Sequence, residues 1–538
     1  MTDGEKEPRN TRSWLRPALG ALSGAVAGFA ALAVAEAVSA WVRPQAGPVI
    51  AVGGAAIDRT PAAVKDWAVR NFGTDDKLVL ESGILAVLAL FALALGILAL
   101  KYRRGGSAGM LFFGAVGAAA AIGRPDSTGF TDALPSAAGA VAGAGLLFLL
   151  VGRLGIRGPA PSRPDATEDD TFRGPGWDRR GFVLAASAAA VASAGAGAFG
   201  RVLNASSGRD AVASRKALVL PAPASPASAV PKGAQSRIPG VSAFTTPNKD
   251  FYRVDTALVV PKVDATAWRL RVHGEGVARP VTLSFDDLLR RELIERDITL
   301  TCVSNEVGGP YVGNARWIGV RLADLLAECG VTPPSEGGRA DQLVARSVDG
   351  MTIGSPVEDV MDGRDALLAV GMNGEPLPFA HGFPVRMVVP GLYGYVSACK
   401  WIEDIELTTF DAYDPYWVKR EWARRAPIKT QSRIDTPKPF ARPTAGTVMV
   451  AGVAWAQHRG IDRVEVRVDD GPWRQAHLAA EDSRDTWRQW SFPWQATKGG
   501  HTLTVRATDR TGAVQTEERA RTVPDGASGR HSVVVTVD

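Results

Sequence analysis

Five apolar segments lie within the first 200 residues of this 538-residue chain. A helix needs about 20 apolar residues to cross a hydrocarbon core about 30 Å thick, so these segments predict membrane-spanning helices. The third segment is short for a span and is also compatible with a tilted or re-entrant piece, so the sequence predicts four or five spans. The segments cover roughly residues 18–41, 78–100, 108–122, 133–151 and 182–200.

Basic residues flank these segments on alternate sides, as the positive-inside rule requires for five spans. Five spans place the N-terminus inside the cell and everything after Gly200 outside. We therefore expect a multi-pass cell-membrane protein in contact with the lipid bilayer, with extracytoplasmic C-terminal domains. The basic residues are Lys6, Arg9, Arg12 and Arg16 before the first segment, Lys101, Arg103 and Arg104 after the second, and Arg153, Arg157, Arg163, Arg173, Arg179 and Arg180 between the fourth and fifth.

The last apolar segment begins with the pair Arg179-Arg180 before a weakly hydrophobic, alanine-rich stretch. This pattern is typical of a twin-arginine (Tat) export signal, although the pair is equally compatible with an ordinary positive-inside flank. Residues 201–240 are rich in Ala, Pro and Ser without periodicity and predict a linker after a transmembrane region of residues 1–200.

Charge and cysteine content exclude several classes of protein. The 61 basic and 56 acidic residues are interspersed and give a net charge of +5, so we expect no nucleic-acid partner. The three cysteines have no paired spacing, which excludes a disulfide framework and a zinc quartet. Cys329 lies in an amphipathic stretch and Cys399 in an apolar one, so both predict small buried side chains.

Cys302 ends a short β-branched run, residues 298–301, and opens a polar, glycine-rich loop, residues 303–309. The residues alone leave two interpretations open, a buried thiol and a soft ligand for a metal. Around it, residues 241–433 alternate short β-branched runs with helical patterns and predict an α+β domain. The clearest strands are residues 268–272 and 402–407, and the clearest helices are residues 284–291 and 322–329.

Several separated motifs in this domain form a specific set through their order and spacing. They are Thr246-Pro247-Asn248-Lys249-Asp250-Phe251-Tyr252-Arg253, the Cys302 loop, Asn314-Ala315-Arg316-Trp317-Ile318-Gly319, Met372-Asn373-Gly374-Glu375-Pro376-Leu377-Pro378, and His381-Gly382-Phe383-Pro384-Val385-Arg386 leading to Lys400-Trp401. With these motifs, residues 244 to about 433 resemble the molybdopterin domain of the sulfite oxidase family.

The resemblance implies a molybdenum–molybdopterin cofactor, with Cys302 as the one protein thiolate on the metal. It implies that Arg386 and Lys400 contact the pterin phosphate, and Arg253 and Arg316 are candidates for binding an anionic substrate. The predicted catalytic residues are Cys302, Arg253 and Arg316. The predicted cofactor-binding residues are Tyr252, Arg253, Cys302, His381, Arg386 and Lys400, with Cys302 as the metal ligand.

The motifs depart from the family pattern in the substrate pocket. Sulfite-oxidising members carry a tyrosine before the Met-Asn-Gly motif and an arginine soon after the cysteine. This chain has Val370 at the first position and no arginine in residues 303–307. We therefore expect weak sulfite oxidation and favour a neutral or organic substrate such as a sulfoxide. In the family the pterin is inserted in the cytoplasm, which favours the Tat route for a loaded domain.

After a proline-rich turn at residues 436–439, strand patterns recur at short intervals, as at residues 447–453, 463–468, 501–506 and 532–537. Period-two alternation with Asp-Asp-Gly and Thr-Gly turns predicts an all-β, immunoglobulin-like sandwich over residues 434–538. It resembles the dimerisation domain of sulfite oxidases, which implies a homodimer. Trp487, Trp490 and Trp494 are predicted core residues.

The function predicted from these observations is a membrane-anchored, extracytoplasmic molybdopterin oxidoreductase. It would transfer an oxygen atom or two electrons between a small molecule and one molybdenum, with a separate protein or a quinone as the electron partner. Two other classes are weighed against it. One is a non-catalytic, membrane-tethered binding protein that keeps the fold without the metal. The other is a small-molecule transporter, which the scarcity of polar residues in the spans disfavours.

Overall fold

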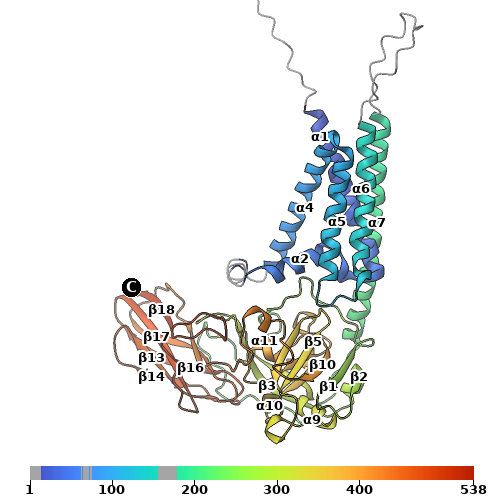
Figure 1. Cartoon of the computed structure of the whole chain (residues 1–538). Coiled ribbons are helices and arrows are strands. Elements are labelled where there is room, and N and C mark those ends of the chain that lie inside the picture. The colour runs from blue at the N-terminus through green and yellow to red at the C-terminus, as the bar shows by residue number, and fades with distance from the viewer. Residues whose placement is uncertain (1–13, 62–63, 65–71, 73–75, 155–178) are drawn as a thin grey trace, which may run out of the picture. The chain divides into compact units, whose positions relative to one another are not determined.

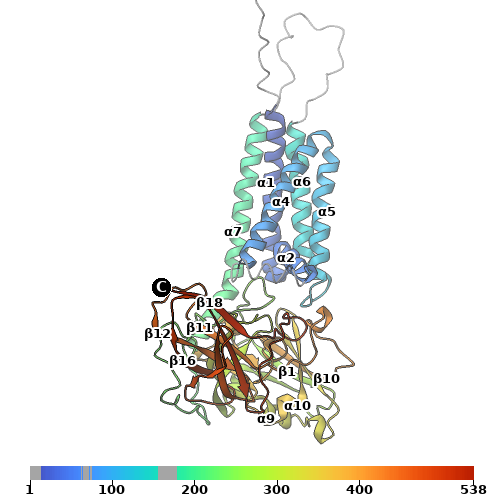
Figure 2. The ribbon, with the colours of Figure 1, turned by 90° about the vertical axis from the view of Figure 1, so that its left-hand side faces the viewer.

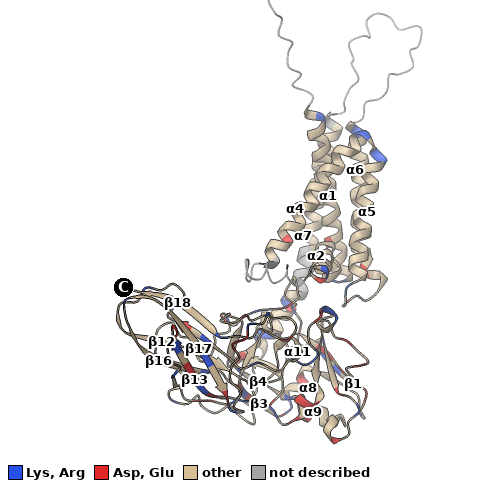
Figure 3. Ribbon diagram, turned by 60° about the vertical axis from the view of Figure 1, so that its left-hand side comes forward, with Lys and Arg blue, Asp and Glu red and all other residues tan. Residues whose placement is uncertain are grey.

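The computed structural model describes residues 14–61, 64, 72, 76–154 and 179–538 (Figure 1). The chain forms two compact units, Met1–Arg209 with Thr256–Val259, and Asp210–Asp255 with Val260–Asp538. Figure 3 shows that the first unit has few charged residues along its helices, whereas the second carries Lys, Arg, Asp and Glu throughout. The predicted basic flanks Lys6, Arg9 and Arg12, and those at residues 157–173, lie outside the described residues.

The first unit is a helical bundle whose long helices run side by side (Figure 2). Within the described part of the chain, five helices are long and apolar enough to cross a membrane, at Leu15–Val42, Leu78–Lys101, Arg103–Ile122, Phe130–Leu154 and Gly181–Gly200. The third helix, expected to be short, has 20 residues. The helices are α1 (Leu15–Val42), α2 (Pro48–Arg59), α4 (Asp76–Lys101), α5 (Arg103–Ile122), α6 (Leu134–Leu154) and α7 (Arg179–Ala217), with short 3₁₀ turns at Pro44–Ala46 and Phe130–Ala133.

Small residues allow the bundle helices to pack closely. A Cβ atom on Gly24 of α1 would lie 1.9 Å from the main-chain oxygen of Ala92 on α4, and one on Gly139 of α6 would lie 2.4 Å from that of Ala31 on α1. Glycine at these positions therefore lets the helix backbones approach more closely than any larger residue would.

Helix α7 extends into the segment that the sequence predicts as a linker from residue 201. It continues to Ala217, and its last residues belong to the second unit. Arg215 donates hydrogen bonds to the main-chain oxygens of Leu377 and Pro376, each at 2.7 Å. The end of α7 is therefore anchored to the Met-Asn-Gly motif region by specific contacts, and irregular chain begins only after it.

Two sheets form the centre of the second unit. The first has the order β2-β1-β10-β5-β6, and the second has the order β3-β4-β7-β8 with β9 paired to β7. The strands are β1 (Arg269–Gly274), β2 (Val281–Ser284), β3 (Leu293–Thr301), β4 (Val312–Arg321), β5 (Gln342–Ser347), β6 (Thr352–Pro356), β7 (Leu367–Met372), β8 (Glu375–Pro376), β9 (Arg386–Val388) and β10 (Ile402–Thr408).

Short helices cover these sheets, so the predicted α+β organisation is present. Ser284 begins the first with a capping box, since its hydroxyl accepts from the Asp287 N–H while the Asp287 carboxylate accepts from the Ser284 N–H. One apolar core joins both sheets and includes the fully buried Trp317 and Phe383. The helices are α8 (Phe285–Leu289), α9 (Leu322–Glu328), α10 (Val357–Met361) and α11 (Gly394–Ser397), with 3₁₀ turns at Pro334–Glu336, Phe379–His381 and Val418–Arg420.

The C-terminal residues form two four-stranded sheets with the orders β11-β12-β16-β15 and β14-β13-β17-β18. Strands of both sheets contribute to a second apolar core, with Val450 and Trp490 from one and Val464 and Leu503 from the other. The three predicted core tryptophans are all buried. The strands are β11 (Gln431–Thr436), β12 (Gly446–Trp455), β13 (Ile461–Val468), β14 (Arg474–Gln475), β15 (His477–Leu478), β16 (Arg488–Ala496), β17 (Gly499–Asp509) and β18 (His531–Val537).

Candidate functional site

Cys302 lies directly after strand β3, as the sequence predicts. Its N–H donates to the main-chain oxygen of Tyr311 at 2.9 Å, and its carbonyl accepts from the Asn305 N–H at 3.1 Å. The Asn305 side chain closes the same loop by accepting from the Tyr311 N–H at 2.8 Å. Cys302 is 9 % exposed, so its thiol is shielded from bulk water and fixed between two strand ends.

The Met-Asn-Gly motif connects β7 to β8 and ties two other motifs to this region. Asn373 (φ 53°) and Gly374 (φ 81°) both have positive φ, as a two-residue hairpin turn of this kind requires. The Asn373 amide donates to the main-chain oxygen of Thr246 at 2.9 Å, and its oxygen accepts from the Arg316 N–H at 2.9 Å. One side chain thus joins the segment before Tyr252 to strand β4.

His381 is a buried, neutral histidine. Its Nε2 lies 3.0 Å from the main-chain oxygen of Asn248, and because a carbonyl only accepts, Nε2 carries the proton. Burial lowers the pKa of His381 to about 4, and the nearby charge of Arg386 acts in the same direction. At neutral pH the imidazole is therefore uncharged and fixed in one tautomer.

Arg386 is a buried cation with few protein partners. It is 6 % exposed, and burial lowers the pKa of its guanidinium to about 10. One nitrogen donates to the main-chain oxygen of His381 at 3.2 Å, and the guanidinium lies 5.0 Å from the centre of the Trp317 ring. The buried Nε has no hydrogen-bond partner, and no carboxylate in the described part of the chain pairs with this side chain.

Lys400 and Arg253 share one carboxylate, Asp255, which is 2 % exposed. Lys400 Nζ lies 2.5 Å and Arg253 Nε 2.8 Å from Asp255 Oδ2. Gly382 brings Arg386 and Lys400 together, because a Cβ atom there would lie 3.0 Å from Arg386 Cβ and 3.2 Å from Lys400 Cα. Arg386 and Lys400 are buried side by side, and Arg253 is held beside them by the carboxylate that it shares with Lys400. Basic side chains grouped in this way fit an anionic group such as a phosphate monoester.

Aromatic rings connect the basic cluster with Cys302. The Phe251 ring lies 5.2 Å from that of Tyr252, 5.6 Å from that of His381 and 5.9 Å from that of Trp317. Burial raises the pKa of Tyr252, the charge of Cys302 raises it further, and Arg386 opposes the shift. The Tyr252 ring also lies 6.3 Å from that of Tyr311, whose main-chain oxygen accepts from the Cys302 N–H, so the aromatic rings link the Cys302 loop with the basic side chains.

The structure does not bring Arg316 to this site, contrary to its predicted catalytic role. Arg316 pairs across the sheet with Asp297 of β3 at 2.6 Å and donates to the main-chain oxygen of Ser228 at 2.9 Å. Side chains alternate between the two faces of a strand, so Arg316 and Trp317 point in opposite directions, and it is Trp317 that contacts Arg386.

The other two cysteines are core residues, as predicted. Cys329 is 2 % exposed and Cys399 is fully buried, and no disulfide joins any of the three cysteines. Burial raises the pKa of both the Cys329 and the Cys399 thiol, which keeps them protonated and unreactive.

Two site residues escaped the sequence prediction although each lies inside a recognised motif region. Asp255 follows Arg253 by two residues, and an acid that close to a predicted anion-binding arginine indicates a paired charge. Trp317 follows Arg316 directly in a β-strand pattern, so the two side chains lie on opposite faces of the strand. The large apolar ring of Trp317 indicates that the face carrying Trp317 is the buried one.

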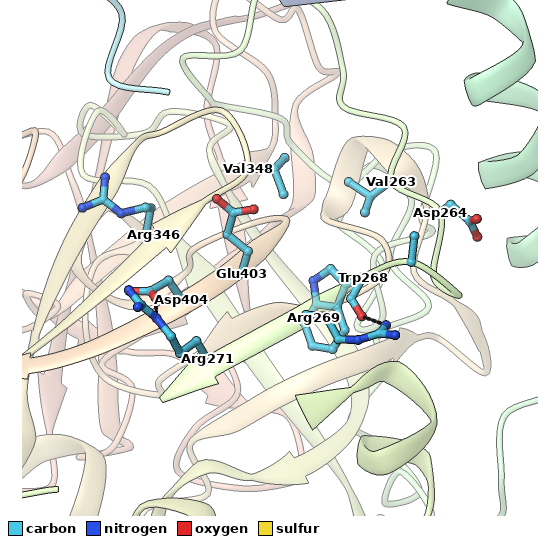
Figure 4. Close-up of a pocket in the computed structure, with 10 residues that line it drawn as sticks. Val263, Asp264, Trp268, Arg269, Arg271, Arg346, Val348, Glu403 and Asp404 are labelled. Atoms are coloured by element: carbon cyan, nitrogen blue, oxygen red, sulfur yellow. Dashed lines mark hydrogen bonds and ion pairs between the residues drawn. The ribbon is translucent and has the colours of Figure 1, made fainter. Parts of the chain in front are cut away.

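A separate surface pocket of about 550 Å³ lies over strands β1, β5 and β10 (Figure 4). Two of its three arginines have nearby acceptors, since Arg271 pairs with Asp404 at 2.7 Å and Arg269 donates to the main-chain oxygen of Trp268 at 2.7 Å. None of its lining residues belongs to the Cys302 site. We therefore assign the chemistry to the Cys302 site and not to this pocket. It is lined by Val263, Asp264, Ala267, Trp268, Arg269, Arg271, Arg346, Val348, Glu403 and Asp404.

Residues 257–417 match the family model of the oxidoreductase molybdopterin binding domain. The matched region contains Cys302, His381, Arg386 and Lys400, whereas Tyr252 and Arg253 lie just before it.

Several known proteins are similar to this chain. Rat mitochondrial sulfite oxidase is 31% identical over 291 residues, covering 46% of this chain and 53% of the relative. The uncharacterized oxidoreductase YuiH of Bacillus subtilis is 33% identical over 162 residues, covering 30% of this chain and 75% of the relative. The crystal structure of the sulfane dehydrogenase SoxCD from Paracoccus pantotrophus is 25% identical with a TM-score of 0.47, covering 55% of this chain and 83% of that one. The chain thus spans about half the length of the rat sulfite oxidase it matches.

Proposed function

Because the chain belongs to the sulfite oxidase family of molybdopterin oxidoreductases, we propose that it transfers an oxygen atom or two electrons between a small molecule and a single molybdenum held by Cys302. The observation that carries this proposal is the pair of buried basic side chains Arg386 and Lys400, which pack together at Gly382, with the partly exposed Arg253 bound to the same carboxylate as Lys400. Such a cluster is costly to bury in a protein that binds no anion.

The residues present fit a molybdenum–molybdopterin cofactor. Cys302 would supply the thiolate to the metal, and Arg386, Lys400 and Arg253 would bind the phosphate of the pterin. His381 and Tyr252 would contact the pterin itself. The bound cofactor supplies a metal that accepts and returns two electrons.

The protein's own residues prepare this site in three ways. The main-chain bonds of Cys302 to Tyr311 and Asn305 fix the thiol at the end of β3. His381 stays neutral, so it offers a polar group without adding to the positive charge. The rings of Phe251, Tyr252 and Trp317 exclude bulk water, which strengthens electrostatic interactions inside the site.

We further propose that the five apolar helices anchor the protein in a membrane, with the cofactor domain on the extracytoplasmic side. The length and hydropathy of these helices support anchoring, and the distribution of basic residues supports the orientation. A Tat signal at Arg179 and Arg180 would export the domain folded, with its cofactor bound. The substrate is a small molecule, and a separate protein or a quinone would exchange electrons with the site.

We propose that the two C-terminal sheets form an immunoglobulin-like domain that mediates a homodimer. Their shared core and antiparallel pairing support the sandwich architecture.

Replacing the proposed metal ligand tests the function directly. We expect Cys302→Ser to abolish turnover and to change the molybdenum spectrum of the purified full-length protein, because a hard oxygen ligand replaces a soft thiolate. Cys329→Ser and Cys399→Ser are the matched controls, and each should cost about 1 kcal/mol of stability while leaving the metal spectrum unchanged. Full activity of Cys302→Ser, or purified protein without molybdenum and pterin, would contradict the proposal.

A further inference from the structure

The outer edge of β3 is completed by loops of the C-terminal sheets. Strand β3 is the first strand of its sheet, so its outward-facing main-chain groups have no partner strand within that sheet. The Thr299 N–H donates to the main-chain oxygen of Asp485 at 2.9 Å, and the Thr299 hydroxyl accepts from the Trp487 N–H at 2.7 Å. These contacts lie three residues before Cys302.

Gln457, in the turn after β12, makes the contact nearest to the cysteine. Its amide nitrogen donates to the main-chain oxygen of Thr299 at 2.9 Å and to the Thr301 hydroxyl at 3.0 Å. Gln457 is fully buried. One amide group thus fixes two of the last three residues of β3, and Thr301 is bonded covalently to Cys302.

The loop that follows Cys302 is also held by residues of the C-terminal sheets. Arg433 of β11 donates to the main-chain oxygen of Gly309 at 2.8 Å. The imidazole of His531, on β18, lies against Gly308, where a Cβ atom would be 2.2 Å from its Cδ2. The segments before and after the cysteine are therefore both fixed from outside the domain that carries the other cofactor contacts.

The hydrogen-bond balance of Gln457 argues against a purely stabilising role. Its Oε1 is buried and has no hydrogen-bond partner in the described part of the chain. A buried unpaired acceptor destabilises a protein, and an apolar side chain of similar size would avoid that cost. An amide at this position is explained if the two hydrogen bonds that its nitrogen donates set the geometry of the end of β3.

We propose that Gln457 is a positioning residue for Cys302, so that the C-terminal domain completes the metal site as well as mediating association. The proposal rests on the proposed function, because it assumes that Cys302 binds the metal. Metal sites tolerate errors of only about 0.5 Å in ligand position, and residues outside the ligand set usually supply that precision.

The test compares Gln457→Leu with Gln431→Leu in the full-length protein. Gln431 is also buried in the C-terminal sheets, but its amide donates to the main-chain oxygen of Ala527 and accepts from Gln515, so its side-chain hydrogen bonds are made outside β3. We expect Gln457→Leu to increase amide hydrogen exchange at residues 299–305 by about tenfold or more, since two hydrogen bonds are lost. We also expect altered g-values in the Mo(V) electron paramagnetic resonance spectrum. Gln431→Leu should change neither measurement.

Thr301→Val keeps the proposal testable if Gln457→Leu does not fold. It removes only the hydroxyl acceptor and should change the same exchange and the same spectrum in the same direction, by less. The double variant, Gln457→Leu with Thr301→Val, should show no larger effect on exchange or on the spectrum than Gln457→Leu alone, because both substitutions remove the hydrogen bond between Gln457 and Thr301.

Unchanged exchange at residues 299–305 together with an unchanged spectrum in folded Gln457→Leu would overturn the positioning role. Failure of the proposed function gives a different result, namely an unaltered metal spectrum in Cys302→Ser. Hydrogen exchange needs no metal, so it tests Gln457 even in that case.

Discussion

The Arg386 guanidinium donates one hydrogen bond, at 3.2 Å, to the main-chain oxygen of His381, while its buried Nε has no partner among the described residues. A buried charge without a counterion destabilises a protein until an anion binds beside it. Arg386 is therefore expected to favour cofactor binding at the expense of the stability of the empty protein.

We predict opposite effects of Arg386→Met on these two properties. Cofactor-free protein should be as stable as the parent or more stable, because an unpaired buried charge is replaced by an apolar side chain of similar length. Pterin retention should weaken by roughly ten- to a hundredfold, since a charge-assisted hydrogen bond contributes about 1.5–3 kcal/mol. Thermal unfolding of the cofactor-free protein and pterin content after purification measure the two effects.

Arg364→Met is the matched control for this prediction. Arg364 is also buried, but it pairs with Asp359 at 2.8 Å and with Asp362 at 2.6 Å. Removing it leaves two acids without their partner, so stability should fall by about 2 kcal/mol or more. Normal pterin content in Arg386→Met would show that this residue does not bind the phosphate.

Stability should fall on acidification because of His531. Its Nδ1 accepts from the Ile434 N–H at 3.0 Å, and burial lowers the pKa of His531 to about 4. Between this value and the unfolded value of about 6.5, the unfolded chain binds a proton that the folded chain does not. The contribution of His531 to the free energy of unfolding is therefore full above pH 6.5 and is lost as the pH falls toward 4. We expect about 2 kcal/mol to be lost between pH 7 and pH 5 from this residue.

His531→Asn keeps an acceptor but cannot bind that proton, so the dependence of unfolding free energy on pH should become shallower by this amount. Denaturation of full-length protein in detergent, followed by tryptophan fluorescence at pH 7 and pH 5, measures it. His501→Asn is the control, because Asp469 raises the pKa of His501 and that histidine stabilises the fold as the pH falls. Equal slopes for the parent and His531→Asn would refute the assignment.

Local sequence patterns predicted the parts of the site that depend on local structure. Residues 298–301, three of which are β-branched, do form the end of β3, and the helical pattern at residues 322–329 does form α9. In each case the side chains act on residues near them in the sequence or in a neighbouring strand.

Contacts between distant segments could not be predicted in this way. Gln457 binds residues more than 150 positions earlier, and an isolated glutamine in a turn has no pattern that indicates its partner. Arg316 was misassigned because its motif identifies the strand but not the face on which the arginine lies. The linker was predicted too early because alanine and serine, which dominate it, are also tolerated in the end of helix α7.

The export route can be tested separately from the chemistry. Replacing Arg179 and Arg180 by lysine keeps the positive charge but removes the twin-arginine signal. If the Tat route is used, the domain after Gly200 should stay inside the cell and be protected from protease added to spheroplasts. Export and cleavage of the double variant, as in the parent, would instead assign these residues to an ordinary positive-inside flank.

Our expectation about the substrate rests on the positions at which the motifs depart from those of sulfite-oxidising members of the family. Val370, at the position of the tyrosine in sulfite-oxidising relatives, is fully buried in strand β7 and offers no hydroxyl. Residues 303–307 contain no arginine, and Arg316 is occupied by Asp297 on the other face of its strand. An oxyanion at the metal would therefore lack at least one hydrogen-bond donor and one charge.

We expect the protein to oxidise sulfite poorly and to act on a neutral or organic oxo compound such as a sulfoxide. Each lost contact in a desolvated pocket weakens transition-state binding by on the order of 2 kcal/mol, so two lost contacts should lower the specificity constant for sulfite roughly a thousandfold. Steady-state assays of molybdenum-loaded protein with sulfite and a panel of sulfoxides, using artificial electron carriers, measure the difference. A specificity constant for sulfite near the diffusional limit would mean that the anion is bound by groups other than those missing here, and the substrate prediction would be wrong.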